Sequence, residues 1–198
     1  MNFEINLNES NGSDSLIEGW LQYTAIGTRD GQVPAQSFYV NQDGEKKVCA
    51  TIKKTGVIMD IYEMRSGWQR FADGSSEWAW NPNLVTWIAR PGDDWKKGIE
   101  IPCCINEKLY MWRQSGTAVI EGMRSIQQAL NGKADGKLPV VKMTGATELK
   151  FKKGTSTFAP EFEVVEFVDR PFVLEAKQAG VPQVEISAED SDMEVAEF

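Results

Sequence analysis

Apolar, aromatic and β-branched residues recur along the chain in short runs that turn-forming residues interrupt. Runs of this kind predict strands, and they fall at residues 15–28, 37–40, 77–80, 84–90 and 99–105. A longer run over residues 47–65 predicts one long strand or a strand pair, with a bulge or bend at Gly56. The stretches Asn81-Pro82-Asn83 and Pro91-Gly92-Asp93 are typical of turns. This part of the chain is therefore expected to form antiparallel β-structure.

One segment has helical spacing instead. Ser115 is a suitable N-cap, and Asn131-Gly132 is a suitable C-terminal stop. Between them, apolar residues recur three and four positions apart, at Val119, Ile120, Met123, Ile126 and Leu130. The spacing predicts one amphipathic helix at about residues 115–130. Three strand-like runs follow, separated by glycine-containing turns, at residues 138–143, 148–152 and 161–167.

The order of these elements favours one fold class. Several strands, one helix and a closing group of strands form the pattern of an OB-fold, a small Greek-key barrel with one face that binds oligonucleotides or oligosaccharides. An SH3-like barrel or a β-sandwich with one helix would give a similar pattern. We predict a mainly β, OB-fold-like Greek-key barrel with one inserted α-helix, formed by a single domain over residues 1–184.

The net charge of −8 is unevenly distributed. Residues 1–45 carry seven acidic groups against Arg29 alone, which gives −6, and residues 154–198 carry eleven against two basic groups, which gives −9. Residues 46–153 carry eighteen Lys and Arg against eleven Asp and Glu, which gives +7. The acidic average argues against a nucleic-acid partner. The basic middle between acidic ends removes that objection.

The C-terminal end forms a distinct segment. Residues 185–198 contain six carboxylates, no basic residue and no amphipathic period, so a disordered acidic tail is expected. Such a tail can simply keep the protein soluble. It can also bind a partner, with Phe198 in a small apolar pocket and Glu194 and Glu197 against basic residues.

Composition restricts the chemistry further. The sequence contains no histidine, which removes Ser-His and Cys-His catalysis and His-ligated zinc. The three cysteines, Cys49, Cys103 and Cys104, lack metal-binding spacing and are expected to be reduced thiols of a cytoplasmic protein. No apolar run is long enough to span a membrane, and no signal peptide is visible. We therefore expect a protein that is not an enzyme, has no cofactor or metal and does not bind membranes.

Aromatic and basic residues carry the strongest functional signal. Five of the seven tryptophans lie in a stretch of 28 residues inside the basic block. Aromatic rings stack on unpaired bases for about 1–3 kcal/mol per base, and Lys and Arg neutralise phosphates. The candidate nucleic-acid contacts are Trp68, Trp78, Trp80, Trp95, Tyr62, Phe71, Lys53, Lys54, Arg65, Arg70, Arg90, Lys150, Lys152 and Lys153. Because stacking tolerates any base, these residues predict a sequence-nonspecific binder of single strands.

Each candidate also has a purely structural interpretation, because tryptophan is common in β-protein cores. Local context assigns three tryptophans to the core, namely Trp20, Trp87 and Trp112. Trp78 and Trp80 share one face of a strand and suit either an exposed platform or the core. Polar, loop-like surroundings make Trp68 and Trp95 stronger ligand candidates. Lys150 and Lys152, expected on one strand face, suit a phosphate backbone or a solvated edge.

The layout resembles the single-stranded DNA-binding proteins of bacteria and of many bacteriophages. The resemblance rests on the acidic tip with Glu194, Glu197 and Phe198, and otherwise on the general arrangement of a basic, aromatic-rich body. The tip lacks the Pro before Phe of the bacterial proteins, so phage versions are more similar. The resemblance implies single-stranded DNA as ligand, and replication, recombination and repair enzymes as partners of the tail. It leaves homo-oligomerisation open and, for a phage protein, implies the cytoplasm of the host.

Other functions fit parts of the sequence. The acidic ends suit a phage protein that mimics nucleic acid and inhibits a host nucleic-acid-binding protein. A strand-annealing recombination protein is a variant of the leading hypothesis. An enzyme that uses carboxylates would draw on Asp93-Asp94, or on Asp60 with Glu63, and no second constellation supports either pair.

Overall fold

The computed structural model describes residues 17–130, 135–152 and 154–179, and in these residues it is mainly β. The strands are β1 (Ile17–Thr24), β2 (Ser37–Gln42), β3 (Glu45–Val48), β4 (Val57–Met59), β5 (Arg65–Ala72), β6 (Ser75–Trp80), β7 (Lys96–Ile105), β8 (Lys108–Ser115), β9 (Leu138–Lys150) and β10 (Ser156–Val168). The helices are α1 (Thr51–Lys54), α2 (Thr117–Leu130) and α3 (Phe172–Ala179).

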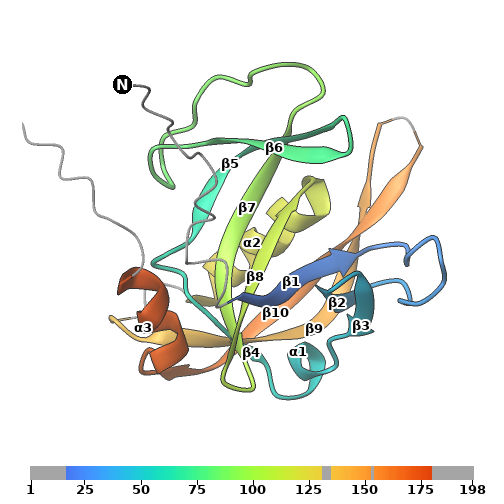
Figure 1. The fold of residues 1–198 in the computed structure, drawn as a ribbon. Coiled ribbons are helices and arrows are strands. Elements are labelled where there is room, and N and C mark those ends of the chain that lie inside the picture. Colours follow the sequence, from blue (N-terminus) through green and yellow to red (C-terminus); the bar gives the residue numbers. More distant parts are fainter. Residues whose placement is uncertain (1–16, 131–134, 153, 180–198) are drawn as a thin grey trace, which may run out of the picture.

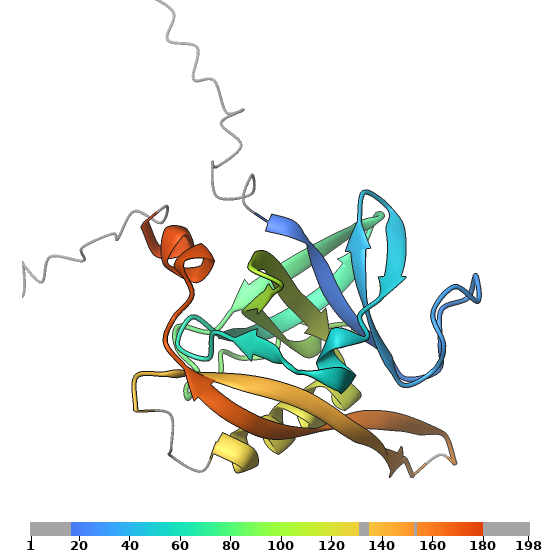
Figure 2. The same ribbon diagram turned by 90° about the horizontal axis from the view of Figure 1, so that it is seen from below.

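All described strands belong to one sheet, which curls strongly into a half-barrel (Figures 1 and 2). The main order is β10-β9-β4-β7-β8-β1-β2-β3, and the β5–β6 hairpin branches off because β5 pairs with β7. Most neighbouring strands are antiparallel, whereas β1 and β8 are parallel. The helices α2 and α3 lie well apart, on different sides of the sheet (Figures 1 and 2).

The two faces of the sheet carry different cores, because successive side chains of a strand point to opposite faces. We call the face that packs with α2 the inner face. Its core includes Leu21, Phe38, Ile101, Trp112 and Phe162, and the rings of Phe38 and Trp112 meet edge to face at 5.1 Å. The outer face carries a smaller core that α3 helps to cover, with members Cys104, Leu109, Met111, Leu138 and Leu174.

Helix α2 approaches β10 closely at Gly122. A Cβ atom at this position would lie 2.7 Å from Pro160 Cγ and 3.3 Å from the ring of Phe162, so only glycine fits without displacement. One turn further, the backbone N–H of Phe162 donates to Ser125 Oγ at 2.9 Å. These contacts fix α2 against the long hairpin of β9 and β10.

A buried ion pair anchors the segment that leads into α3. Asp60, which is fully buried, accepts a hydrogen bond from the guanidinium of Arg170. It also accepts one from the backbone N–H of Glu63 at 3.3 Å. Burial raises the pKa of Asp60, and the charge of Arg170 opposes that effect. The pair ties the segment before α3 to the connection between β4 and β5.

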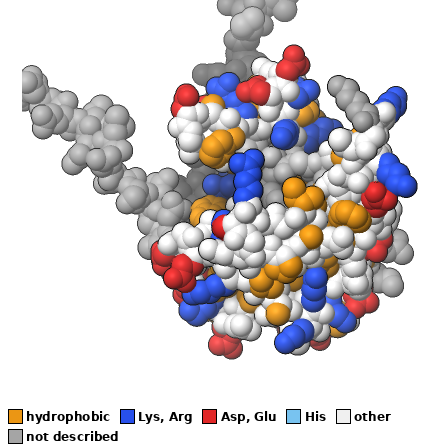
Figure 3. Space-filling view, turned by 90° about the vertical axis from the view of Figure 1, so that its right-hand side faces the viewer, with side chains coloured by type: hydrophobic (Ala, Val, Ile, Leu, Met, Phe, Trp, Pro, Cys, Tyr) orange, Lys and Arg blue, Asp and Glu red, His pale blue; other side chains and the backbone are white. Residues whose placement is uncertain are grey.

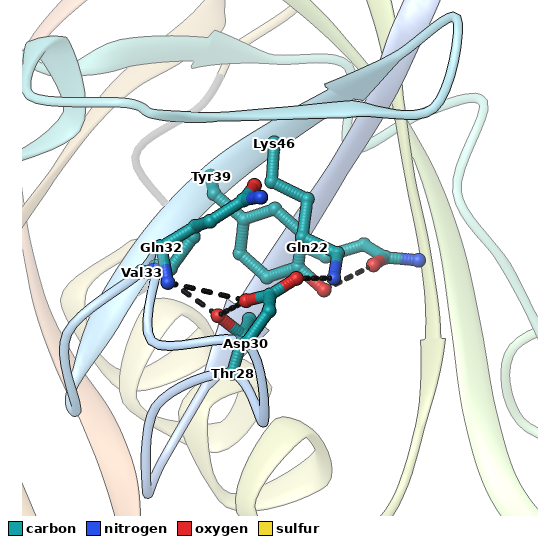
Figure 4. Close-up of polar contacts among 7 residues, drawn as sticks. All are labelled: Gln22, Thr28, Asp30, Gln32, Val33, Tyr39 and Lys46. Carbon is teal, nitrogen blue, oxygen red and sulfur yellow. Dashed lines mark hydrogen bonds and ion pairs between the residues drawn. The ribbon is translucent and has the colours of Figure 1, made fainter.

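The β1–β2 connection is ordered by a small polar network (Figure 4). Asp30 Oδ1 accepts hydrogen bonds from Thr28 Oγ1 at 2.5 Å and from the Gln32 N–H at 3.1 Å. Its other oxygen pairs with Lys46 Nζ at 2.6 Å. These hydrogen bonds, together with Lys46, hold the pKa of Asp30 well below its usual range. The loop is thereby tied to β3.

Much of the predicted β-structure and the amphipathic helix are confirmed. The strands expected near residues 15–28, 37–40, 77–80 and 99–105 correspond to β1, β2, β6 and β7, and the helix corresponds to α2. The N-cap prediction was one residue off, because Ser115 ends β8 and the carbonyl of Gly116 accepts from the Ile120 N–H. The predicted stop at Asn131-Gly132, the domain end at residue 184 and the tail lie outside the described residues.

Residues 84–90 do not form the predicted strand. Asparagine side chains take the backbone groups that a strand would pair. Asn83 Oδ1 accepts from the N–H groups of Val85 and Thr86 at 2.9 and 2.6 Å, and Asn81 Oδ1 accepts from that of Ile88 at 3.1 Å. The segment is therefore an ordered loop between β6 and β7.

Other boundaries also differ from the prediction. Residues 47–65 divide into the end of β3, the short helix α1, β4 and the first residue of β5, because the chain turns at Ala50 and reaches a φ of +92° at Gly56. Strands β5 and β8 and helix α3 had no counterpart in the prediction. The runs at 138–143 and 148–152 are largely one strand, since β9 continues through Gly145 to Lys150, with a register shift opposite Glu161 and Phe162.

Candidate nucleic-acid interface

Three hollows that share lining residues follow α2 from its first turn to Leu130, and together we call them the groove. The apolar hollow, of about 440 Å³, lies between α2, β7 and the loop of residues 81–95. The basic hollow, of about 410 Å³, shares Lys97, Ile120 and Arg124 with it. The hairpin hollow, of about 300 Å³, shares Gly116 and Thr117 with the basic hollow and ends at the β9–β10 hairpin.

Figure 3 views the molecule from the side of this hairpin. A hollow separates the upper part of the molecule, which holds β5, β6 and the loop of residues 81–95, from the hairpin on the right. Lys and Arg side chains, drawn in blue, border it on both sides. Both borders come from hairpin or loop segments, whereas the floor comes from the ends of β7 and β8 and the first turn of α2.

Two tryptophans form the aromatic wall of the groove. Trp68 on β5 and Trp87 in the loop meet edge to face, with ring centroids 5.6 Å apart. Trp68 Nε1 donates to the carbonyl of Ile88 at 3.1 Å, which ties the loop to β5. Trp87 keeps 37% of its surface exposed. The rings are therefore fixed in position while part of their surface remains open.

Basic groups lie directly over these rings. Lys97 Nζ is 4.6 Å from the Trp87 centroid and 5.7 Å from that of Trp68, and the Arg90 guanidinium is 5.8 Å from Trp68. Lys97 and Trp68 are register partners on neighbouring strands, so they share the inner face of the sheet. Stacked cations of this kind remain able to meet a phosphate at the mouth of the groove.

The charge of this part of the groove is only partly neutralised. Arg70 pairs with Glu77 at 2.8 Å, and Arg124 pairs with Glu121 at 2.7 Å. Arg90 donates instead to the backbone carbonyls of Trp95, at 2.9 Å, and of Asp93. Within residues 17–130, 135–152 and 154–179, no ion pair forms at Arg90, Lys96 or Lys97. A positive potential therefore remains beside the aromatic wall.

Trp95, which its polar surroundings made a ligand candidate, is largely buried beneath Arg70. It lies in the loop before β7, but only 9% of its surface is exposed. The guanidinium of Arg70 covers its ring at 5.2 Å, and Gly92 lies against its edge. Trp95 forms part of the wall of the basic hollow and supports Arg70 and Arg90. The polar sequence around it reflects the turn and not the position of the ring.

Trp68 does not lie in a loop, as its surroundings suggested, but within β5. The local signal failed because the residues around Trp68 in this strand are mostly polar or glycine and do not alternate with apolar ones. Trp68 lines the basic hollow, and its contact with a ligand stays a prediction.

Trp78 and Trp80 lie on the outer face, away from the groove. Their rings stack in parallel, 4.4 Å apart and 10° from coplanar. Arg65 covers Trp80 at 4.2 Å, and Trp78 packs over the backbone of Gly98. Much of the surface that could stack on a base is thus already in contact with protein.

The aromatic and basic side chains of the outer face continue from β5 and β6 onto β8 and β1, and their arginines face a carboxylate. Glu100 is buried between Arg113, which donates to it closely, and Arg65, which lies at 3.7 Å. Arg113 also covers the ring of Trp20 at 4.7 Å. Because its arginines already face a carboxylate, this row is a weaker candidate for phosphate binding than the groove. Trp20 is only partly buried, whereas Trp112 is fully buried, as expected.

The remaining candidates are scattered around the molecule. Tyr62 lies in the β4–β5 turn and accepts a hydrogen bond from the Gly136 N–H at 3.0 Å. Phe71 is exposed near the end of β5. Lys53 and Lys54 lie on α1, where Lys53 Nζ donates to the carbonyl of Gln36 at 2.9 Å. None of these four lines the groove.

The lysines of the β9–β10 hairpin lie at the far end of the groove. The prediction that Lys150 and Lys152 share one strand face is wrong, because Lys150 ends β9 and Lys152 lies in the turn that follows. Phe151 between them lines the hairpin hollow. Lys153 and the tail residues Glu194, Glu197 and Phe198 lie outside the described residues.

Several groove residues were not among the candidate nucleic-acid contacts of the sequence interpretation. Trp87 was assigned to the core because apolar residues surround it, but Leu84 and Val85 are 44% and 89% exposed. Lys97 and Arg124 also line the groove. The available signals were the Lys96-Lys97 pair in the tryptophan-rich segment and a basic residue beside the apolar stripe of the helix.

Two of the four carboxylates considered for catalysis are engaged in ion pairs. Asp60 is buried against Arg170, and Asp94 lies 3.8 Å from Arg70. The described residues contain no group of three or more His, Cys, Asp or Glu that could hold a metal ion. All three cysteines are buried, and burial raises the pKa of each thiol. Among the described helices, none has the length and apolar character to cross a membrane.

No protein-family model, no curated protein and no solved structure matches the chain. The geometry and charge of the groove are therefore the grounds for the function proposed below.

Proposed function

We propose that the protein binds single-stranded DNA in the groove without sequence preference. The observation that carries the proposal is the wall of Trp68 and Trp87 beside Arg90, Lys96 and Lys97, which have no acidic partner in the described residues. Unpaired bases can stack on or pack beside the rings while the phosphates meet the cations. A duplex keeps its bases stacked on one another, so this combination favours a single strand.

The arrangement of strands supports an OB-fold-like barrel. The segment β10-β9-β4-β7-β8 follows the strand order five-four-one-two-three of that fold, with α2 between the third and fourth strands. Strand β1 lies beside β8 and reaches β10, since the Tyr23 hydroxyl donates to the carbonyl of Phe158 at 3.0 Å. It would thus fill the gap through which the barrel ordinarily closes.

In this alignment, the two loops that bind oligonucleotides in OB-folds correspond to the borders of the groove. The connection between strands one and two becomes the long excursion through β5, β6 and the loop of residues 81–95. The connection between strands four and five becomes the β9–β10 hairpin with Lys150 and Lys152. The agreement between fold position and side-chain chemistry supports the groove as the DNA path.

The proposed biological setting follows the resemblance to phage and bacterial proteins. The protein would cover single strands during phage DNA replication and recombination in the host cytoplasm. Its tail, with Glu194, Glu197 and Phe198, would recruit partner enzymes.

Titration of a fluorescently labelled oligo(dT) tests the groove directly. We expect Trp87→Ala to weaken binding by roughly 5- to 150-fold, which corresponds to the loss of one stacking contact of about 1–3 kcal/mol. Lys97→Gln should weaken binding and lower the magnitude of the salt slope, d log K/d log[salt], by about 0.7–1. The matched control is Trp80→Ala on the outer face, which should leave affinity within about twofold of the original.

The outcomes separate the two faces of the sheet. If Trp80→Ala weakens binding and Trp87→Ala does not, the DNA path runs over the outer face. If the unaltered protein binds no oligo(dT), even at low salt, the proposed function is wrong. Thermal unfolding of each variant identifies any loss of binding caused by loss of fold.

A further inference from the structure

Helix α2 has more apolar surface than its packing against the sheet uses. Val119, Gly122 and Ile126 are buried. Ile120, Met123 and Leu130 form a second stripe, only partly buried, that lines the apolar hollow. A stripe of this kind at the edge of a groove is expected to contact an apolar ligand.

The opposite wall of the apolar hollow is held in a fixed position. Leu84 and Trp87 belong to the loop that Asn81 and Asn83 order through four hydrogen bonds, three of them to backbone N–H groups. The side-chain amide of Asn81 donates to Ser66 Oγ on β5 at 2.9 Å. The hollow is therefore largely formed before a ligand binds.

The polar groups around this hollow can all donate hydrogen bonds. They are the ammonium of Lys97, the guanidinium of Arg124, the amide of Gln127 and the hydroxyl of Ser66. Glu121 holds Arg124 through one terminal nitrogen, at 2.7 and 2.8 Å, which leaves its other N–H groups for a ligand. A ligand with carbonyl oxygens on a flat, otherwise apolar ring matches this set.

We propose that the apolar hollow holds one base turned out of the bound strand, and that thymine fits it best. The proposal rests on the proposed function and deepens it. The hollow adjoins the basic hollow, with which it shares Lys97, Ile120 and Arg124, so a base in it would leave its phosphates near the cations. Its volume of about 440 Å³ accommodates a nucleobase.

Thymine matches the lining in two ways. Its two ring carbonyls accept hydrogen bonds, and its methyl group suits contact with Leu84, Met123 and Leu130. Adenine has no carbonyl oxygen for the Lys97 and Arg124 donors, and only the Gln127 amide oxygen and the Ser66 hydroxyl could accept from its amino group. The binding of most bases along the strand remains indifferent to sequence, whereas this position gives a preference for thymine.

Two neighbouring loop residues provide a matched pair of variants. Leu84 lines the apolar hollow, while Val85 is more exposed and lines none of the three hollows. Leu84→Ser and Val85→Ser both place a hydroxyl on the surface loop and leave the core intact. Each variant is titrated with oligo(dT), with oligo(dA) and with a chain of abasic sites that has the same number of phosphates.

We expect Leu84→Ser to weaken oligo(dT) binding about tenfold and oligo(dA) binding less, and to leave abasic binding within about twofold. Val85→Ser should change none of the three. Because the same oligomers are used for both variants, differences in their own stacking cancel.

Equal losses of oligo(dT) and abasic binding in Leu84→Ser would overturn the base site, since the loop would then act on the backbone of the strand. Equal effects of Leu84→Ser and Val85→Ser would overturn it as well. In both cases the unaltered protein still binds oligo(dT), so the proposed function survives. No binding by the unaltered protein overturns both.

Discussion

Tryptophan illustrates how burial and neighbours decide the role of a residue in this protein. Trp112 is fully buried in the inner-face core. Trp78 and Trp80 stack on each other on the outer face, below Arg65. Trp68 and Trp87 line the groove, and Lys97 lies against both rings. One residue type thus serves as core, as surface stack and as candidate ligand contact, and the difference comes from the strand face or loop that each residue occupies.

Tyr23 gives a prediction at the same scale. Burial raises the pKa of its hydroxyl from 10.0 to about 12. Between these values the unfolded chain loses the proton and the folded protein keeps it, so the free energy of unfolding falls as the pH rises from about 10 to about 12, by at most about 1.4 kcal/mol per pH unit for this group.

Urea unfolding at intervals between pH 9 and 11.5 measures this slope. Tyr23→Phe removes the titrating group together with its hydrogen bond to Phe158, so the variant should be less stable at pH 9 but lose stability less steeply above pH 10. Burial also raises the pKa of Tyr39 and Tyr110, so a smaller slope should persist in the variant. Parallel curves for the two proteins would contradict the assignment to Tyr23.

At the scale of elements, periodicity was informative wherever a segment buries one regular face. The helix was predictable because Val119, Ile126 and their neighbours keep helical spacing. Residues 84–90 were predicted as a strand from their β propensity alone. In the structure, Asn81 and Asn83 accept hydrogen bonds from backbone N–H groups that a strand would pair, and residue propensities do not describe such contacts. Strand β5 was missed because its residues do not alternate between polar and apolar types, and its exposed positions are one charged residue, Arg65, and one apolar residue, Phe71.

The contact of α2 with β10 leads to a prediction whose sign is unusual. In an open helix, Gly→Ala stabilises by roughly 1 kcal/mol. At Gly122 the added methyl group would overlap Pro160, so Gly122→Ala is expected to destabilise the protein by about 1–3 kcal/mol. Chemical denaturation measures the difference, and Gln128→Ala, at an exposed position of the same helix, should be neutral or slightly stabilising. A stabilised Gly122→Ala protein would show that the helix can move away from the hairpin.

At the scale of the whole molecule, the division of charge along the chain matters more than its sum. The basic middle supplies Arg90, Lys96 and Lys97 to the groove, whereas residues 185–198 add six carboxylates and no cation. A polyanion attached to the same molecule would compete with DNA for the groove at low ionic strength, where charges are weakly screened.

Removal of residues 185–198 is therefore expected to tighten binding of oligo(dT) at low salt. The gain should shrink as salt rises, because screening weakens the competing tail. Anisotropy titrations at about 20 mM and about 300 mM salt measure both effects, since the Debye length falls by a factor of about four between them. Equal affinities of the full-length and shortened proteins at low salt would refute competition by the tail and leave the groove assignment intact.

The sequence by itself determined the β-rich class, the amphipathic helix and the concentration of tryptophan and basic residues in the middle of the chain. These features depend on local spacing and composition, which are readable along one dimension. Tertiary structure alone decided which aromatics share a surface. Pairing of β5 with β7 places Trp68 beside Lys97, and the asparagine-ordered loop brings Trp87 to the same site. Strand register and loop closure set those neighbours, and both depend on contacts between residues distant in sequence.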